Sequence, residues 1–187
     1  MTIFEDLAFR YFEFLETQYG FRRTQMLGNY VRWQSSDVFV EIYFDSRRSY
    51  EFDARIGRLG VLINGNEIPY GLDEMARLGG LSWGTRAVRA CSEAELDARL
   101  AEMAEAMKVA ALRFLLNDTQ AYVILQQQRE RECTAYAEET ELRRARETAE
   151  KAWKQGDFRT VVDTYKRHWQ HLTPSERKRY EIALKRC

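Results

Sequence analysis

The stretch DVFVEIYFDSRRSYEFDARIG, residues 37–57, decides how the rest of the chain is arranged. Apolar and polar side chains alternate on both sides of a short polar break, which is typical of two neighbouring antiparallel strands with one buried face. We expect the break at residues 45–49 to turn the chain back on itself. The side chains expected to share the buried face are Val38, Val40, Ile42, Phe44, Tyr50, Phe52, Ala54 and Ile56.

The segments before this hairpin extend it into a larger sheet. Residues 21–36 read as two short strands joined at Gly28-Asn29, because Gly and Asn tolerate the positive φ of a tight turn. Residues 3–19 carry apolar side chains at the spacing of an amphipathic helix, which needs a face to cover. The sequence therefore predicts an α+β fold in which an N-terminal helix lies on a four-stranded antiparallel meander.

Helices dominate the chain after the sheet. The glycine-rich stretch 57–84 reads as loops, with a short strand at 61–63 and a short helix at 73–78. Ser92 and Glu95 form the pattern of a capping box and open a long helix. Asn117-Asp118 interrupts that helix and caps another near Thr119, which predicts a long helical hairpin.

The C-terminal third is helical and strongly charged. Residues 126–146 form a charged run without sustained heptads, so a solvated helix is favoured over a coiled coil. Gly156 ends this helix, and Thr173 with Pro174 and Glu176 begins the last one. We expect two domains: an α+β domain over residues 1–118, and a helical region over 119–187.

The segment AEKAWKQGDFRTVVDTYKRHWQHLTPSE, residues 149–176, resembles one tetratricopeptide unit. The similarity lies in the small residues, the Gly-Asp-aromatic step, the tyrosine and the Leu-x-Pro ending. The segment departs from the family at Val161 and Val162, where an alanine is expected, and no second repeat follows. Because repeat arrays need several units, the resemblance implies a single tetratricopeptide-like hairpin and no superhelical groove.

Composition excludes several classes of protein. The 187 residues include 29 basic and 29 acidic side chains, so no overall charge favours nucleic acid or an anionic membrane as a partner. No apolar run approaches the roughly 18–20 residues that span a bilayer, and the N-terminus lacks the basic region of a signal peptide. Three widely spaced cysteines are typical of a reducing compartment, which predicts a cytoplasmic protein.

The residues that usually carry chemistry are sparse. His168 and His171 are spaced as i and i+3 on an expected helix, but no further ligand motif completes a metal site. Cys91 precedes a helix but has no histidine near it in sequence. The glycines match no phosphate-binding loop. We therefore predict no catalytic residue, no cofactor and no metal.

The outer face of the sheet is the expected site. Close carboxylates there could bind a cation or do acid–base work, but Arg32 and Arg55 are expected to neutralise them. Aromatic and charged side chains together are typical of protein recognition. The residues predicted to form this protein-binding surface are Trp33, Phe39, Glu41, Tyr43, Glu51, Asp53 and Arg55.

Three functions follow as hypotheses. The first is a non-catalytic, bacterial-type cytoplasmic protein that binds another protein; the chain is similar to uncharacterised bacterial α+β proteins, some of which are immunity proteins that neutralise a cognate toxin. The second is a small-molecule-binding protein or enzyme with a pocket between the sheet and the helices of residues 92–153. The third is self-association through residues 126–146, which would give a homodimer.

Overall fold

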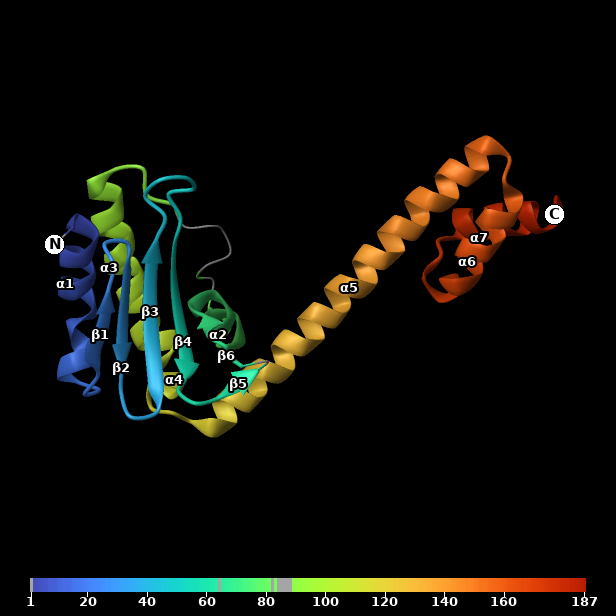
Figure 1. Cartoon of the computed structure of the whole chain (residues 1–187). Helices are drawn as coiled ribbons and strands as arrows, with labels where there is room; N and C mark the ends of the chain where they lie inside the picture. The colour runs from blue at the N-terminus through green and yellow to red at the C-terminus, as the bar shows by residue number, and fades with distance from the viewer. Residues whose placement is uncertain (1, 64, 82, 84–88) are drawn as a thin grey trace. The chain divides into compact units, whose positions relative to one another are not determined.

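The fold is α+β, as the sequence predicts: an N-terminal helix, an antiparallel meander and then long helices packing as hairpins (Figure 1). The computed structural model describes residues 2–63, 65–81, 83 and 89–187. Asn64, Ser82 and Gly84 of the expected loops lie outside the described residues.

The chain divides into two compact units, Met1–Gln128 and Arg129–Cys187. The division falls inside the helix α5 (Thr119–Gln155), ten residues after the boundary expected from the sequence at 118/119. Each unit has its own cluster of buried apolar side chains and is described separately.

The sheet of the first unit has five antiparallel strands in the order β1-β2-β3-β4-β7. The first four form the predicted meander, and their register puts alternate residues of neighbouring strands on the same face. A fifth, two-residue strand follows Pro69 and pairs with β4. The bounds are β1 Arg22–Met26, β2 Tyr30–Gln34, β3 Val38–Phe44, β4 Phe52–Arg58 and β7 Tyr70–Gly71.

The strand β1 is an edge of this sheet, and all five of its side chains are exposed. Its pairing with β2 is irregular, because the register shifts between Arg23 and Gln25. An extra residue of this kind bends a strand and interrupts its hydrogen-bonding ladder.

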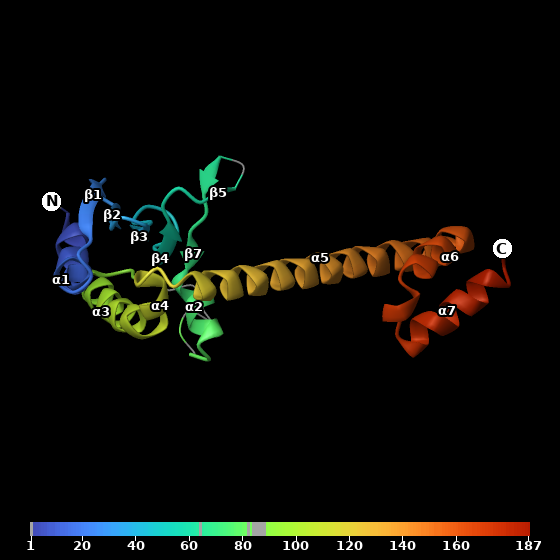
Figure 2. The ribbon, with the colours of Figure 1, turned by 90° about the horizontal axis from the view of Figure 1, so that it is seen from below.

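Helices cover one face of the sheet and a small hairpin lies on the other side (Figure 2). The hairpin consists of β5 (Leu62–Ile63) and β6 (Asn66–Glu67). The apolar face is thereby enclosed, while the opposite face has no helix over it in the described part of the chain. The helices of this layer are α1 Ile3–Thr17, α2 Leu72–Leu78, α3 Glu93–Ala110, α4 Leu112–Leu115 and the first turns of α5.

The helix starts follow the capping residues of the sequence. The hydroxyl of Ser92 accepts from the backbone N–H of Glu95 at 3.2 Å, as predicted. The carboxylate of Asp118 accepts from the N–H groups of Gln120 and Ala121 at 2.9 and 3.2 Å, and so caps α5. Asn117, just before it, has a φ of 57°, a left-handed conformation that Asn tolerates better than most residues.

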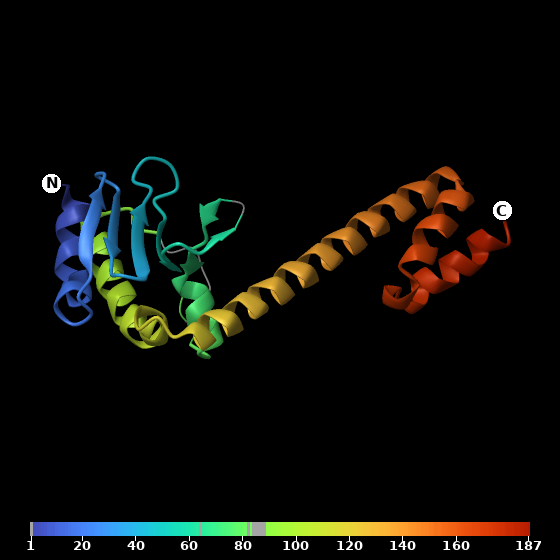
Figure 3. The same ribbon diagram turned by 60° about the horizontal axis from the view of Figure 1, so that its bottom comes forward.

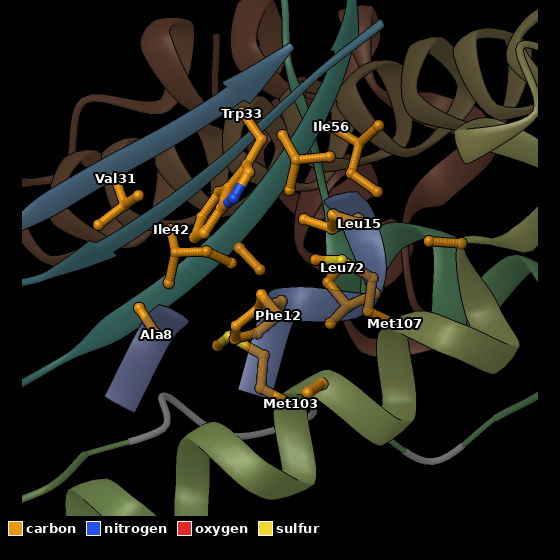
Figure 4. Packing of buried hydrophobic residues seen from close by; sticks show 14 of the residues in the cluster. Ala8, Phe12, Leu15, Val31, Trp33, Ile42, Ile56, Leu72, Met103 and Met107 are labelled. Atoms are coloured by element: carbon orange, nitrogen blue, oxygen red, sulfur yellow. The ribbon is translucent and has the colours of Figure 1, made fainter. Parts of the chain in front are cut away.

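The core lies between the sheet and the helices α1 and α3, where Val31, Trp33 and Ile42 face Phe12 and Met103 (Figure 4). The placement of Trp33 on the outer face was wrong. Its ring is fully buried, because Trp33 pairs with Val40 and therefore shares the inner face with it. Its indole N–H donates to Glu16 Oε1 at 3.1 Å, which satisfies the one polar atom of the ring.

The second unit contains the end of α5, α6 (Phe158–Arg167), a short 3₁₀ turn at Trp169–His171 and α7 (Pro174–Leu184). Gly156 adopts a φ of +74° and separates α5 from α6, as the sequence predicts. Leu184, the last residue of α7, is 54% exposed. The buried cluster is small and consists of Ala149, Ala152, Val161, Tyr165, Leu172 and Ala183.

No helix among the described residues combines the length and the apolar character that crossing a membrane requires.

Candidate functional site: the outer face of the sheet

The outer face is built from three rows of cross-strand neighbours. Each row takes one residue from β2, one from β3 and one from β4, because the strands pair in register. The rows are Tyr30–Tyr43–Asp53, Arg32–Glu41–Arg55 and Gln34–Phe39–Gly57.

The middle of this face is a network of charges around Arg32. Its guanidinium contacts Glu41 Oε1 at 2.8 Å and Glu67 Oε2 at 2.6 Å, and Glu67 belongs to the hairpin strand β6. The Tyr30 hydroxyl donates to Glu41 Oε1 at 2.7 Å. With its amide oxygen assigned toward Arg32, Gln34 also accepts from Nε at 2.7 Å. The network therefore joins the β5–β6 hairpin to the sheet.

The protonation states of this network follow from burial and charge. Burial and the neighbouring Glu41 carboxylate raise the pKa of Tyr30 to about 12, so its hydroxyl keeps its proton at neutral pH. Burial alone would lower the pKa of Arg32, but its hydrogen bonds with Glu67 and Tyr30 outweigh that effect and raise it. The face thus contains a fixed donor and a fixed cation, and neither serves as a proton shuttle near pH 7.

Phe39 lies on the outer face, as predicted, but it is not available to a partner. Its ring is 1% exposed, because Arg32 stacks over it with the guanidinium carbon 4.0 Å from the ring centroid. Its cross-strand neighbour is Gly57, and a Cβ at that position would overlap the Phe39 ring. Phe39 is therefore buried beneath Arg32 and the charge network.

Beside the network the face opens into a hollow of about 250 Å³. Tyr43 is 41% exposed there, and the Arg55 guanidinium pairs with Asp53 Oδ2 at 2.7 Å. The residues that line the hollow are Tyr30, Glu41, Tyr43, Asp53 and Arg55. Four of the seven predicted site residues are thus brought together around this hollow.

Glu51 is the remaining member of the predicted surface, and it lies apart from the hollow. It forms an isolated bridge with Arg89 and an ion pair with the Arg89 guanidinium at 2.9 Å. Its role in the structure is to connect the start of β4 to the segment that leads into α3.

Sequence reasoning missed Tyr30 and Glu67 as members of the site. Tyr30 could have been predicted as a site residue, because the alternation of residues 30–34 puts it on the same face as Arg32. Glu67 carried no signal, since it belongs to a two-residue strand in a loop-rich stretch.

The carboxylates predicted for this face are engaged in ion pairs. Glu41, Glu51 and Asp53 each have an arginine partner, as the sequence leads one to expect for Glu41 and Asp53. In the described ranges, no three His, Cys, Asp or Glu side chains gather in a way that could hold a metal ion.

The two histidines do not share one helix. His168 follows the last residue of α6, and His171 ends the 3₁₀ turn, so the expected i and i+3 placement on a helix was wrong. His168 is the C-cap of α6, and its backbone N–H donates to the carbonyl of Tyr165 at 3.2 Å. His168 Nε2 lies 3.9 Å from Glu141 Oε1.

Comparison of the chain with protein-family models, curated proteins and solved structures finds no match.

Proposed function

We propose that this protein acts without catalysis, by binding another protein through the outer face of its sheet. The observation that carries this proposal is a sheet face with no helix over it in the described part of the chain, where an exposed tyrosine lies among charges that are already paired. Paired charges reduce the cost of desolvation on binding, because neither ion is left alone in the interface. Tyrosine and arginine are the residue types most often found at energetic hot spots.

Within this class we propose the role of an immunity protein of a bacterial-type cytoplasm, which neutralises a toxin encoded beside it. This role requires a rigid binding surface, since tight inhibitors bind with little rearrangement. The network of Arg32 with Glu41 and Glu67 supports that requirement, because it ties three segments of the chain together beside the hollow.

The small-molecule alternative has less support at this face. A hollow of about 250 Å³ is smaller than the roughly 300–1,000 Å³ of ordinary ligand pockets. The expected location between the sheet and the helices holds the apolar core instead.

The test is direct binding to the product of the neighbouring gene, measured by calorimetry with the full chain. We expect Tyr43→Ala and Arg55→Ala each to weaken binding at least about tenfold, because each removes a side chain from the centre of the surface. Co-expression should also protect cells from the neighbouring protein, and Tyr43→Ala should reduce that protection.

The matched control is Tyr136→Ala, which removes a tyrosine that is 69% exposed on α5 in the second unit. Its binding should equal that of the wild type. Absence of a complex, or equal losses for Tyr43→Ala and Tyr136→Ala, would contradict the proposal.

A further inference from the structure

A second and larger pocket lies at one end of the sheet, outside the hollow described above. Its volume is about 560 Å³, within the range of small-molecule sites. The β1–β2 turn and the β3–β4 turn lie at the same end of the sheet (Figure 3). Residues of both turns line the pocket. The lining residues are Thr2, Leu27, Gly28, Asn29, Tyr43, Asp45, Ser46, Arg47 and Arg48.

Hydrogen bonds hold the floor of this pocket in place. The Thr2 hydroxyl donates to the carbonyl of Gly28 at 2.7 Å, and the Gly28 N–H donates to Glu5 Oε1 at 2.9 Å. The Phe44 N–H donates to the carbonyl of Asn29 at 2.9 Å. Three segments that are distant in sequence are thus joined, so the pocket exists before any ligand arrives.

The β3–β4 turn presents two cations to the pocket. The Asp45 carboxylate accepts from the N–H groups of Arg47, Arg48 and Ser49 at 3.1, 3.1 and 3.3 Å. These bonds turn the carboxylate toward its own backbone and lower its pKa, with the Arg47 N–H making the largest contribution. In the described part of the chain, no ion pair involves the guanidinium of Arg47 or Arg48.

The two arginines differ in this from three arginines of the neighbouring strands and loops. Arg32, Arg55 and Arg89 are each within 3 Å of a carboxylate oxygen. Two adjacent, unpaired guanidiniums at a polar pocket attract an anion, and their fork of donors matches the oxygens of a phosphate group.

The other lining residues indicate which chemical groups a phosphate-bearing ligand of this pocket would carry. Tyr43 is 41% and Leu27 69% exposed, so both can contact a flat ring. The Asn29 amide can donate to and accept from the edge of such a ring. We propose that this pocket binds a small phosphate monoester of nucleotide size, with the phosphate on Arg47 and Arg48 and the ring against Tyr43.

The experiment titrates the full chain by calorimetry with the four ribonucleoside monophosphates, with adenosine, and with inorganic phosphate at low ionic strength. We expect at least one monophosphate to bind more tightly than both phosphate and adenosine. NMR signals of the Asn29 and Ser46 amides should shift during that titration, because both residues line the pocket.

Arg47→Gln with Arg48→Gln should raise the dissociation constant at least about tenfold, since two charged contacts are lost. Tyr43→Ala should bring the affinity for the nucleotide close to that for phosphate. The matched control is Arg143→Gln with Arg144→Gln, which removes an adjacent pair of exposed arginines on α5 and should change nothing.

Three results would overturn the proposal: none of the monophosphates binds, phosphate binds as tightly as the nucleotides, or both double variants lose affinity equally. Thermal unfolding of each variant checks that the substitutions leave the fold intact. Tyr43 lines both the hollow and this pocket, so the two proposals are separated by the arginines: Arg55 lines only the hollow, and Arg47 and Arg48 line only this pocket.

Discussion

At the scale of single residues, the contact between Gly57 and Phe39 leaves no room for a larger side chain at position 57. A Cβ at Gly57 would overlap the Phe39 ring, which is held from above by Arg32. We expect Gly57→Ala to lower the free energy of unfolding by about 1–3 kcal/mol, as overpacking usually does. Urea denaturation of the purified variant measures this loss.

The control is a double-mutant cycle with Phe39→Leu, which leaves more room above Gly57. If the overlap is the cause, Gly57→Ala should cost clearly less in the Phe39→Leu background, and the two substitutions should be coupled. Equal costs in both backgrounds would show that Phe39 is not what makes glycine necessary.

Single residues also show how far sequence reasoning reached. The alternation of residues 38–44 placed Phe39, Glu41 and Tyr43 correctly on one face. The same rule puts Trp33 inside, since it alternates with Tyr30, Arg32 and Gln34 along β2. Its large aromatic ring, typical of binding surfaces, points to the opposite and wrong placement. That Phe39 would be covered could not be predicted, because the covering groups come from another strand and a distant hairpin.

At the scale of elements, the start of α7 depends on an ionised cap. Glu176 accepts from the Thr173 N–H at 2.7 Å and from Arg146 Nε at 2.8 Å. Burial alone would raise the pKa of Glu176, but these bonds outweigh it and hold the pKa below its ordinary value of 4.5. The stabilisation is therefore present above pH 4.5 and disappears as the pH falls through the lowered pKa.

We expect Glu176→Gln to destabilise α7 by about 1–2 kcal/mol at neutral pH, because it removes a charge-assisted cap. At a pH below the pKa of Glu176 the difference from the wild type should vanish. Urea unfolding followed through NMR signals of α6 and α7 measures it at both pH values. Glu181→Gln, an exposed acid on the same helix, should have little effect, and an equal effect would contradict the role of the cap.

Elements with strong local signals were predictable and short ones were not. Thr173, Pro174 and Glu176 form a capping box with proline in the first turn, and α7 begins there as expected. The strand β7 contains two residues and exists only because it pairs with Arg55 and Ile56 of β4. Such a strand has no period to detect, so only the tertiary structure shows it.

At the scale of the whole molecule, side-chain packing determines where the boundary between the two units falls. The first three turns of α5 belong to the core of the first unit, where Ala121, Tyr122 and Leu125 are at most 4% exposed. The Tyr122 hydroxyl donates to the carbonyl of Phe114 at 3.1 Å, and its ring stands edge-on to Phe114. Sequence reasoning placed the boundary at the helix start because it could not see these contacts.

Two truncations test this assignment. A chain ending at residue 128 should unfold with a midpoint close to that of the first unit in the full protein. A chain ending at residue 118 should be less stable by about 3–6 kcal/mol, since Tyr122 and Leu125 each contribute about 1.5–3 kcal/mol of burial. Urea denaturation distinguishes them, and equal midpoints would show that α5 adds nothing to the first unit.

The exposed edge strand β1 has a consequence for how copies of the protein meet in concentrated solution. A long, flat edge would recruit other chains into a continuous sheet and lead to aggregates. Here the shift between Arg23 and Gln25 distorts the ladder, and neighbouring arginines add charge to the same rim. Growth of the sheet from molecule to molecule through this edge is therefore discouraged.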